Sequence, residues 1–300
     1  MQPAPLQFIQ DFLFLEKNVT VYLKREDLLH PTISGNKWRK LKYNLSAAKE
    51  QGKRTLLTFG GAYSNHIAAV AAAGKEYHFT TLGFIRGEEH LPLNPTLAFA
   101  ASCGMQLHYL NRETYRNRNK PEFIQQLQQK YPEAYLLPEG GTNTLAVLGC
   151  TEIVADISIP FDYICCAAGT GGTLAGIIAG LNGEKNVIGF PALNADDFLQ
   201  HEIADLIKSY NGEAYQNWHL ETLYHFGGYA KVKPDLLHFI TRFKEQHSIM
   251  LEPVYTGKML FGLYDLIRQD YFAPGSCIIA IHTGGLQGLA GFAERLGILF

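Results

Sequence analysis

The sequence of 300 residues has little of what marks several large protein classes. Its five cysteines form no CxxC pair, which indicates ordinary core thiols in a reducing compartment, and no metal-ligating cluster stands out. No apolar run reaches the roughly 18 residues that a membrane span needs. The segment MQPAPLQFIQDF (1–12) lacks a basic region followed by a long apolar stretch. We therefore expect a soluble, cytoplasmic protein with no membrane partner and no metal.

An excess of charge of either sign is also missing. Lys and Arg number 26 and Asp and Glu number 28, so the net charge is -2, and neither sign forms a long run. A protein that binds nucleic acid or an acidic membrane surface usually carries a basic patch. We therefore expect neither of these as a partner.

What the sequence does have is an alternation of strand-like and helix-like segments. Hydrophobic residues make up 47% of the chain, enough to bury the core of one large or two moderate domains. Helical patterns separate most of the runs that are typical of strands, which are 21–26, 54–59, 79–85, 134–138, 163–168, 186–190 and 277–282. This order predicts an α/β fold with mainly parallel sheets. Because ligands of such sheets bind beyond the carboxyl ends of the strands, the loops there are the candidate sites.

Three of these loops combine glycine with polar side chains: GGAYSNH (60–66), GTGGT (169–173) and HTGG (282–285). The GTGGT loop opens directly into a helical pattern, so its backbone N–H groups can bind a phosphate. A tight turn without a ligand explains this loop alone equally well. It contains no lysine and therefore is no Walker loop, and Leu174 stands where the GxGxxG fingerprint needs glycine. A single phosphate, bound without a metal, fits best.

A lysine opens the helical pattern in SGNKWRK (34–40). Asn36 is predicted to cap this helix, which puts Lys37 at the positive end of the helix dipole. That position favours the neutral amine, the form that attacks a carbonyl. A solvated surface lysine is the alternative. The lysine and the phosphate loop together indicate pyridoxal phosphate as the cofactor.

The motifs as a set resemble the tryptophan-synthase β-like pyridoxal-phosphate enzymes of fold type II. Within these, the chain is similar to the branch of D-cysteine desulfhydrases and 1-aminocyclopropane-1-carboxylate deaminases. The resemblance covers nearly the whole chain, and its motifs follow the family's order: KREDL, SGNKWRKL, GGAYSNH, GTGGTLAG, EPVYTGK and HTGG. It implies two parallel-sheet α/β domains with the cofactor between them. The large domain would comprise 1–47 and 151–300, and the small domain 48–150.

The resemblance also implies roles for single residues. Lys37 would form the internal aldimine and later move the α-proton of the substrate. Asn65 would bond the ring oxygen of the cofactor, and Ser64 would bind the substrate carboxylate or act on the substrate itself, although both could merely cap a helix. The phosphate would be cradled by Gly169, Thr170, Gly171, Gly172 and Thr173.

Two tyrosines would face the substrate, namely Tyr229 and Tyr255. Core tyrosines with satisfied hydroxyls are the alternative. Thr256 stands where the cyclopropane deaminases have glutamate, and Thr283 where they have an apolar residue. Since a neutral hydroxyl cannot hold the pyridine nitrogen protonated as an anion does, the cofactor would be a milder electron sink. This favours β-elimination of a thiol over opening of a cyclopropane ring.

The sequence thus predicts a lyase or deaminase that acts on a small amino acid, with D-cysteine desulfhydrase as the first choice. The alternative within the family is 1-aminocyclopropane-1-carboxylate deaminase, followed by a racemase or a β-replacement enzyme. A dinucleotide-binding oxidoreductase and a non-catalytic cofactor-binding protein are the alternatives outside it. The resemblance implies a homodimer.

Overall fold

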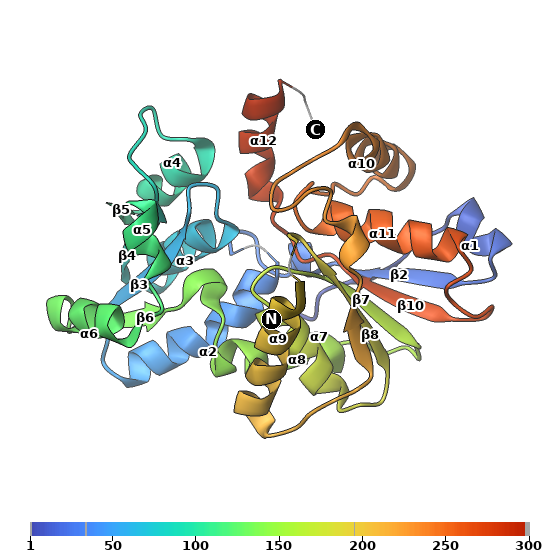
Figure 1. Ribbon diagram of the computed structural model, residues 1–300, viewed down its shortest axis with the longest axis horizontal. Coiled ribbons are helices and arrows are strands. Elements are labelled where there is room, and N and C mark those ends of the chain that lie inside the picture. The colour runs from blue at the N-terminus through green and yellow to red at the C-terminus, as the bar shows by residue number, and fades with distance from the viewer. Residues whose placement is uncertain (1, 34, 195, 298–300) are drawn as a thin grey trace.

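Two separate sheets organise the protein, and each is formed by its own part of the chain (Figure 1). The computed structural model describes residues 2–33, 35–194 and 196–297. The larger sheet has the order β1-β2-β10-β7-β8-β9, formed by β1 (Leu6–Phe8), β2 (Thr20–Lys24), β7 (Tyr163–Ala168), β8 (Asn186–Pro191), β9 (Trp218–Leu220) and β10 (Cys277–Ile281). The smaller sheet has the order β5-β4-β3-β6, formed by β3 (Thr55–Gly61), β4 (Thr80–Arg86), β5 (Gln106–Leu110) and β6 (Ala134–Leu137).

Helices follow most of the strands, as the predicted α/β alternation requires. They are α1 (Phe12–Glu16), α2 (Asn36–Glu50), α3 (Asn65–Tyr77), α4 (Pro95–Ser102), α5 (Arg112–Arg116), α6 (Pro121–Lys130), α7 (Thr144–Ala155), α8 (Gly172–Leu181), α9 (Asp196–Asn211), α10 (Pro234–His247), α11 (Thr256–Arg268) and α12 (Leu289–Leu296). Short 3-10 turns are η1 (Glu26–Leu28), η2 (Glu139–Gly141), η3 (Thr222–Tyr224) and η4 (Leu286–Gly288). Both sheets are parallel except where β1 pairs with β2, so the predicted fold class is confirmed.

All the predicted strand segments form strands, and the strands that the sequence did not predict lie at sheet edges. These are β1, β5 and β9. β1 and β9 have three residues each, too few for an alternating pattern. β5 contains no fully buried residue, because one of its sides has no partner strand among the described residues. The apolar pattern that predicts a strand therefore weakens at the edge.

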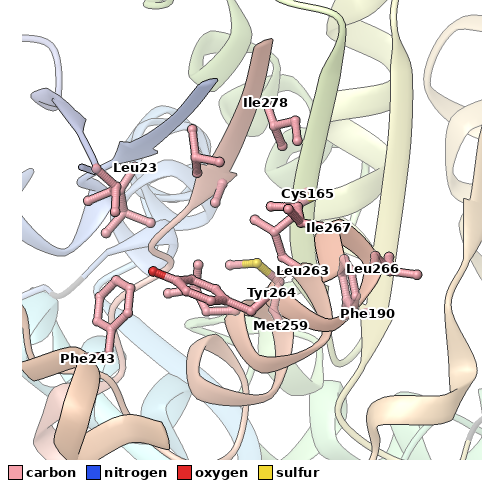
Figure 2. Packing of buried hydrophobic residues seen from close by; sticks show 14 of the residues in the cluster. Leu23, Cys165, Phe190, Phe243, Met259, Leu263, Tyr264, Leu266, Ile267 and Ile278 are labelled. Carbon is pink, nitrogen blue, oxygen red and sulfur yellow. The ribbon is translucent and has the colours of Figure 1, made fainter. Parts of the chain in front are cut away.

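Helices cover both faces of the larger sheet. On one face, α11 presents Met259, Leu263 and Ile267 at helical spacing, and these pack with Cys165 and Ile278 of the sheet (Figure 2). α1 and α10 extend the same layer, while α7, α8 and α9 pack on the opposite face. Burial on both faces explains why the central strands are continuously apolar.

The smaller sheet is also covered on both faces. Leu56 of β3 points into a cluster with α2, α3 and α4, and the next residue, Leu57, points into a cluster with α5 and α6. The alternation follows from the two-residue period of a strand. No helix in the described part of the chain is both long and apolar enough to cross a membrane.

The predicted domain limits stay predictions, but the helices suggest a refinement of one. The limit at 150/151 falls inside α7, which is continuous from Thr144 to Ala155. α7 packs against α8, which belongs to the unit with the larger sheet, and against α2. We propose that this limit lies at the start of α7.

Candidate active site

The three glycine-containing loops that the sequence singled out lie after β3, β7 and β10, and close backbone packing links them to the other predicted site residues. A Cβ atom added to Gly285 would lie 2.7 Å from Nδ2 of Asn65, which joins the loop after β10 to the start of α3. One added to Gly169 would lie 3.0 Å from the ring of Tyr255. The glycines at these positions thus permit contacts that any side chain would obstruct.

The lysine helix begins differently from the prediction. The N-cap of α2 is Gly35, with φ 61°, and no side chain caps the helix, so the assignment of Asn36 as N-cap was wrong. A Cβ atom on Gly35 would lie 2.0 Å from the carbonyl oxygen of Thr283, which accepts a hydrogen bond from the Asn36 N–H at 3.1 Å. Only glycine combines this positive φ with so close an approach.

The side chain of Asn36 does not cap the helix but contacts two other predicted site residues. Its Nδ2 donates to Oγ1 of Thr173 at 2.8 Å, and its Oδ1 accepts from Nζ of Lys37 at 2.9 Å. The amide therefore connects the amine to the loop after β7. Burial lowers the pKa of Lys37, and the negative charge of Glu252 opposes that shift in part. The shift has the predicted direction, towards the neutral amine, but its cause is burial, whereas the prediction rested on the helix dipole.

The loop after β7 has the conformation expected of a phosphate site. Gly171 has φ 76°, and α8 starts at Gly172, so the free N–H groups of the first turn face the loop. Oγ1 of Thr170 lies 2.5 Å from Oγ1 of Thr142. A second lysine, Lys40, donates to Thr142 Oγ1 at 2.8 Å and reaches Thr170 Oγ1 at 3.4 Å.

These groups suit a phosphate ester. Helix N–H groups, two hydroxyls and an ammonium all donate, and a phosphate dianion accepts from all of them. A Cβ atom on Gly172 would lie 3.0 Å from the Thr142 side chain and 3.1 Å from Cε of Lys40, so glycine keeps the cradle open. Burial, reinforced by the charge of Lys37, lowers the pKa of Lys40 to about 7.

The predicted tyrosines lie together. Tyr255 donates from its hydroxyl to that of Tyr229 at 3.4 Å, and the two rings meet edge to face, with centroids 6.0 Å apart. Tyr229 is 47% exposed, which excludes the alternative of a core tyrosine for this residue. Burial raises the pKa of Tyr255 well above its ordinary value, so its hydroxyl stays neutral and able to donate.

Ser64 and Asn65 begin α3. Oγ of Ser64 accepts from the N–H groups of His66 and Ile67, so this serine does cap the helix, and its own hydrogen remains available for another acceptor. Asn65 accepts at Oδ1 from Nε2 of Gln287.

Thr256 and Thr283 are both buried. Thr256 donates from its hydroxyl to Oε1 of Glu252 at 2.9 Å. Glu252 also accepts from the N–H groups of residues 254–256 at the start of α11, and burial raises its pKa. Its carboxyl group thus accepts hydrogen bonds from four donors, namely the Thr256 hydroxyl and three backbone N–H groups.

Sequence reasoning missed four residues here: Lys40, Thr142, Glu252 and Gln287. Lys40 is three positions after Lys37 on one helix, Glu252 begins the motif EPVYTGK, and Gln287 follows HTGG closely. Their places in or beside these motifs could have indicated them as site residues. Thr142 lies in the small-sheet part of the chain, and its sequence context gives none.

No group of three or more His, Cys, Asp or Glu side chains suited to a metal ion occurs within residues 2–33, 35–194 and 196–297. Two mainly parallel sheets, whose loops lie around a half-buried lysine and a loop suited to a phosphate ester, fit a class of enzymes that use a phosphorylated carbonyl cofactor. The chain belongs to the family of pyridoxal-phosphate dependent enzymes, whose model matches residues 2–284, and it depends on pyridoxal phosphate.

Individual relatives agree with this assignment. A Pyrococcus horikoshii protein, provisionally named 1-aminocyclopropane-1-carboxylate deaminase, is 30% identical over 98% of this chain and 92% of its own length. A mitochondrial Arabidopsis thaliana protein, named bifunctional D-cysteine desulfhydrase/1-aminocyclopropane-1-carboxylate deaminase, is 29% identical over 95% of this chain and 77% of its own. A crystal structure of a protein described as an ACC deaminase homologue superposes with a TM-score of 0.86 at 29% identity, covering 99% of this chain and 93% of that one.

Proposed function

We propose that the protein eliminates the thiol of D-cysteine and releases pyruvate, ammonia and sulfide. The observation that carries this choice is Thr256, a buried hydroxyl that donates to Glu252 at the start of α11. In this proposal Thr256 and Thr283 adjoin the pyridine nitrogen, so a neutral hydroxyl separates that nitrogen from the Glu252 carboxyl group. Bound pyridoxal phosphate supplies an electron sink for the bond broken at the α-carbon.

The residues of the chain perform the other steps. Lys37 would hold the cofactor and take the α-proton, because burial favours its neutral amine. Asn65 would donate to the ring oxygen, and the loop from Gly169 to Thr173, with Lys40 and Thr142, would hold the phosphate. Ser64 would donate its free hydrogen to the substrate carboxylate.

The tyrosine pair would complete the substrate side of the site. Tyr255 and Tyr229 share a hydroxyl contact, and burial raises the pKa of Tyr255, so its hydroxyl keeps its proton. Either can donate to the departing thiolate, which lowers the barrier to its departure.

Deamination of 1-aminocyclopropane-1-carboxylate to 2-oxobutanoate and ammonia is the second candidate. It is supported by the 30% identity to the Pyrococcus horikoshii protein and by the double name of the plant protein. The test is a panel of D- and L-amino acids and the cyclopropane substrate, incubated with the holoenzyme and assayed for the 2-oxo acid. We expect D-cysteine to give the highest kcat/KM. A higher value for the cyclopropane substrate would reverse the order of the two activities.

A further inference from the structure

Gln287 of η4 links two elements on the other side of the site. Its Nε2 donates to Oδ1 of Asn65 at the start of α3, and its Oε1 accepts from Oγ1 of Thr96 in α4 at 3.2 Å. α3 and α4 both pack on the smaller sheet (Figure 1), whereas η4 (Leu286–Gly288) follows β10 of the larger sheet in the chain. The larger-sheet unit thus supplies one amide that both elements of the smaller unit contact.

An amide side chain has a donor end and an acceptor end, so a partner at one end decides what the other end presents. With Oδ1 of Asn65 accepting from Gln287, Nδ2 is left to donate. Nδ2 makes no hydrogen bond to another described residue, and it lies against Gly285 in the loop after β10. Gly285 in turn adjoins Glu252, since an added Cβ atom would lie 3.3 Å from Cγ of that residue.

We propose that Gln287 is a positioning residue, which holds the Asn65 amide with Nδ2 towards the ring oxygen of the cofactor. This rests on the proposed contact between Asn65 and that oxygen. The ring oxygen is acidic, and its anion accepts a charge-assisted hydrogen bond from an N–H donor. The reversed amide would instead oppose two acceptors. Thr96 completes the contact, because its hydroxyl hydrogen-bonds to the far end of the Gln287 amide.

The sharpest test is Gln287→Glu, which keeps the size of the side chain but can only accept. Glutamate would attract Nδ2 of Asn65 and turn Oδ1 towards the cofactor. Gln287→Leu removes the contact without reversing it, so the amide stays free to donate. If Gln287 acted through packing alone, leucine would be the more harmful change.

Equilibrium titration of each ligand-free variant with pyridoxal phosphate gives the affinity, and thermal unfolding confirms that each variant folds. We expect Gln287→Glu to weaken binding about tenfold or more, and Gln287→Leu to weaken it less. The visible absorbance of the bound cofactor, which reports ionisation of its ring oxygen, should shift in Gln287→Glu and stay unchanged in Gln287→Leu. Gln125→Glu, an exposed change on α6, is the matched control for added charge.

Combining Gln287→Glu with Asn65→Ala tests whether the glutamate acts through Asn65. We expect Asn65→Ala to weaken binding and Gln287→Glu to add nothing further in that background. If Gln287→Glu weakens binding as much in the Asn65→Ala background as in the parent, its charge acts directly on the cofactor. If Gln287→Glu weakens binding no more than Gln287→Leu does, Gln287 acts through packing. Either result overturns the proposal and leaves the proposed function standing. Unchanged affinity in Asn65→Ala itself would remove the Asn65 contact from the proposed site.

Discussion

The hydroxyl hydrogen of Thr256 is donated to a buried carboxylate oxygen of Glu252, 2.9 Å away. That carboxylate also accepts from three backbone N–H groups at the start of α11, so it is fixed in place. A buried carboxyl group therefore lies close to the proposed position of the pyridine ring, with the neutral hydroxyl of Thr256 between them. This arrangement makes the charge beside the ring nitrogen adjustable by substitution.

Thr256→Glu combined with Thr283→Leu should shift the ratio of kcat/KM values from D-cysteine towards the cyclopropane substrate. A carboxylate at 256 would favour the protonated pyridine and deepen the electron sink, while leucine would restore the apolar position of the deaminase pattern. Because Glu252 is adjacent, repulsion raises the pKa of one of the two carboxyl groups. The ratio should therefore shift further at higher pH, where both carboxyl groups are ionised, than at lower pH.

Steady-state kinetics with both substrates, assayed as 2-oxo acid, measure this ratio, and comparing kcat/KM values reports transition-state stabilisation directly. Thr256→Val is the control, since it removes the hydroxyl without adding charge. A ratio in the double variant equal to that of the parent would refute the electronic argument and leave the cofactor assignment intact.

Lys37→Ala should abolish the visible band of the holoenzyme and the covalent label that borohydride fixes, while the fold is retained. The Lys37 amine is the group that the proposed site assigns to covalent attachment of the cofactor, whereas the amine of Lys40 is assigned to the phosphate. Lys37→Arg should not restore the band, because a guanidinium stays protonated. Lys49→Ala, an exposed change on the same helix, should behave as the parent. An unchanged spectrum in Lys37→Ala would be incompatible with the proposed site.

The pKa of Lys40, which burial lowers to about 7, predicts how binding of a phosphate ester depends on pH. The ammonium is present below that pH in the ligand-free protein and is lost above it, whereas a phosphate monoester is already a dianion above about pH 6. The affinity for pyridoxine 5'-phosphate, which has no aldehyde to react with Lys37, should therefore fall as the pH rises from 7 to 9.

Calorimetric titration across that range measures the slope. Lys40→Met should bind weakly and with little pH dependence, and Lys40→Arg should bind without the fall above pH 7. A fall of the same steepness in Lys40→Met would show that another group is responsible.

Tyr255→Phe should lower kcat/KM for D-cysteine about 10- to 100-fold and change the affinity for pyridoxal phosphate less than about threefold. The hydroxyl that it removes is neutral and contacts Tyr229, on the proposed substrate side of the cofactor. Tyr264→Phe is the matched control, because Tyr264 donates to Asp11 in the core. That variant should lose about 1 kcal/mol of stability and little activity. Comparable kinetic losses in both variants would argue against a role of Tyr255 at the substrate.

The sequence predicted the central strands because strands that are buried on both faces are continuously apolar. It predicted the loops after them because these loops contain glycine. Edge strands such as β5 were not predicted, because β5 has a partner strand on one side only among the described residues and its apolar pattern is weak. The start of α2 was misassigned because Asn36 is a good N-cap by type, whereas the approach of Thr283 at Gly35 is a tertiary contact. Local sequence does not encode such a contact.

The same distinction applies to the site. Lys37 and the loop from Gly169 to Thr173 were found because each has a local signature. Glu252 and Gln287 were overlooked although they lie in or beside quoted motifs, since a carboxylate or an amide shows its role only through its partners. Thr142 acts through a contact with Thr170 across the two sheet units, and only the folded chain reveals it.

The place of β10 constrains the order in which this protein can assemble during synthesis. β10 is the final strand of the described chain, yet it lies between β2 and β7 in the middle of the larger sheet. β3 to β6 are complete once residue 137 has emerged, so the smaller sheet can form early. β2 can pair with β1 early, but its parallel neighbour β10 is made only about 250 residues later. A ribosome-bound chain therefore holds Lys37 without the Thr283 backbone that receives its helix until residue 283 has been synthesised.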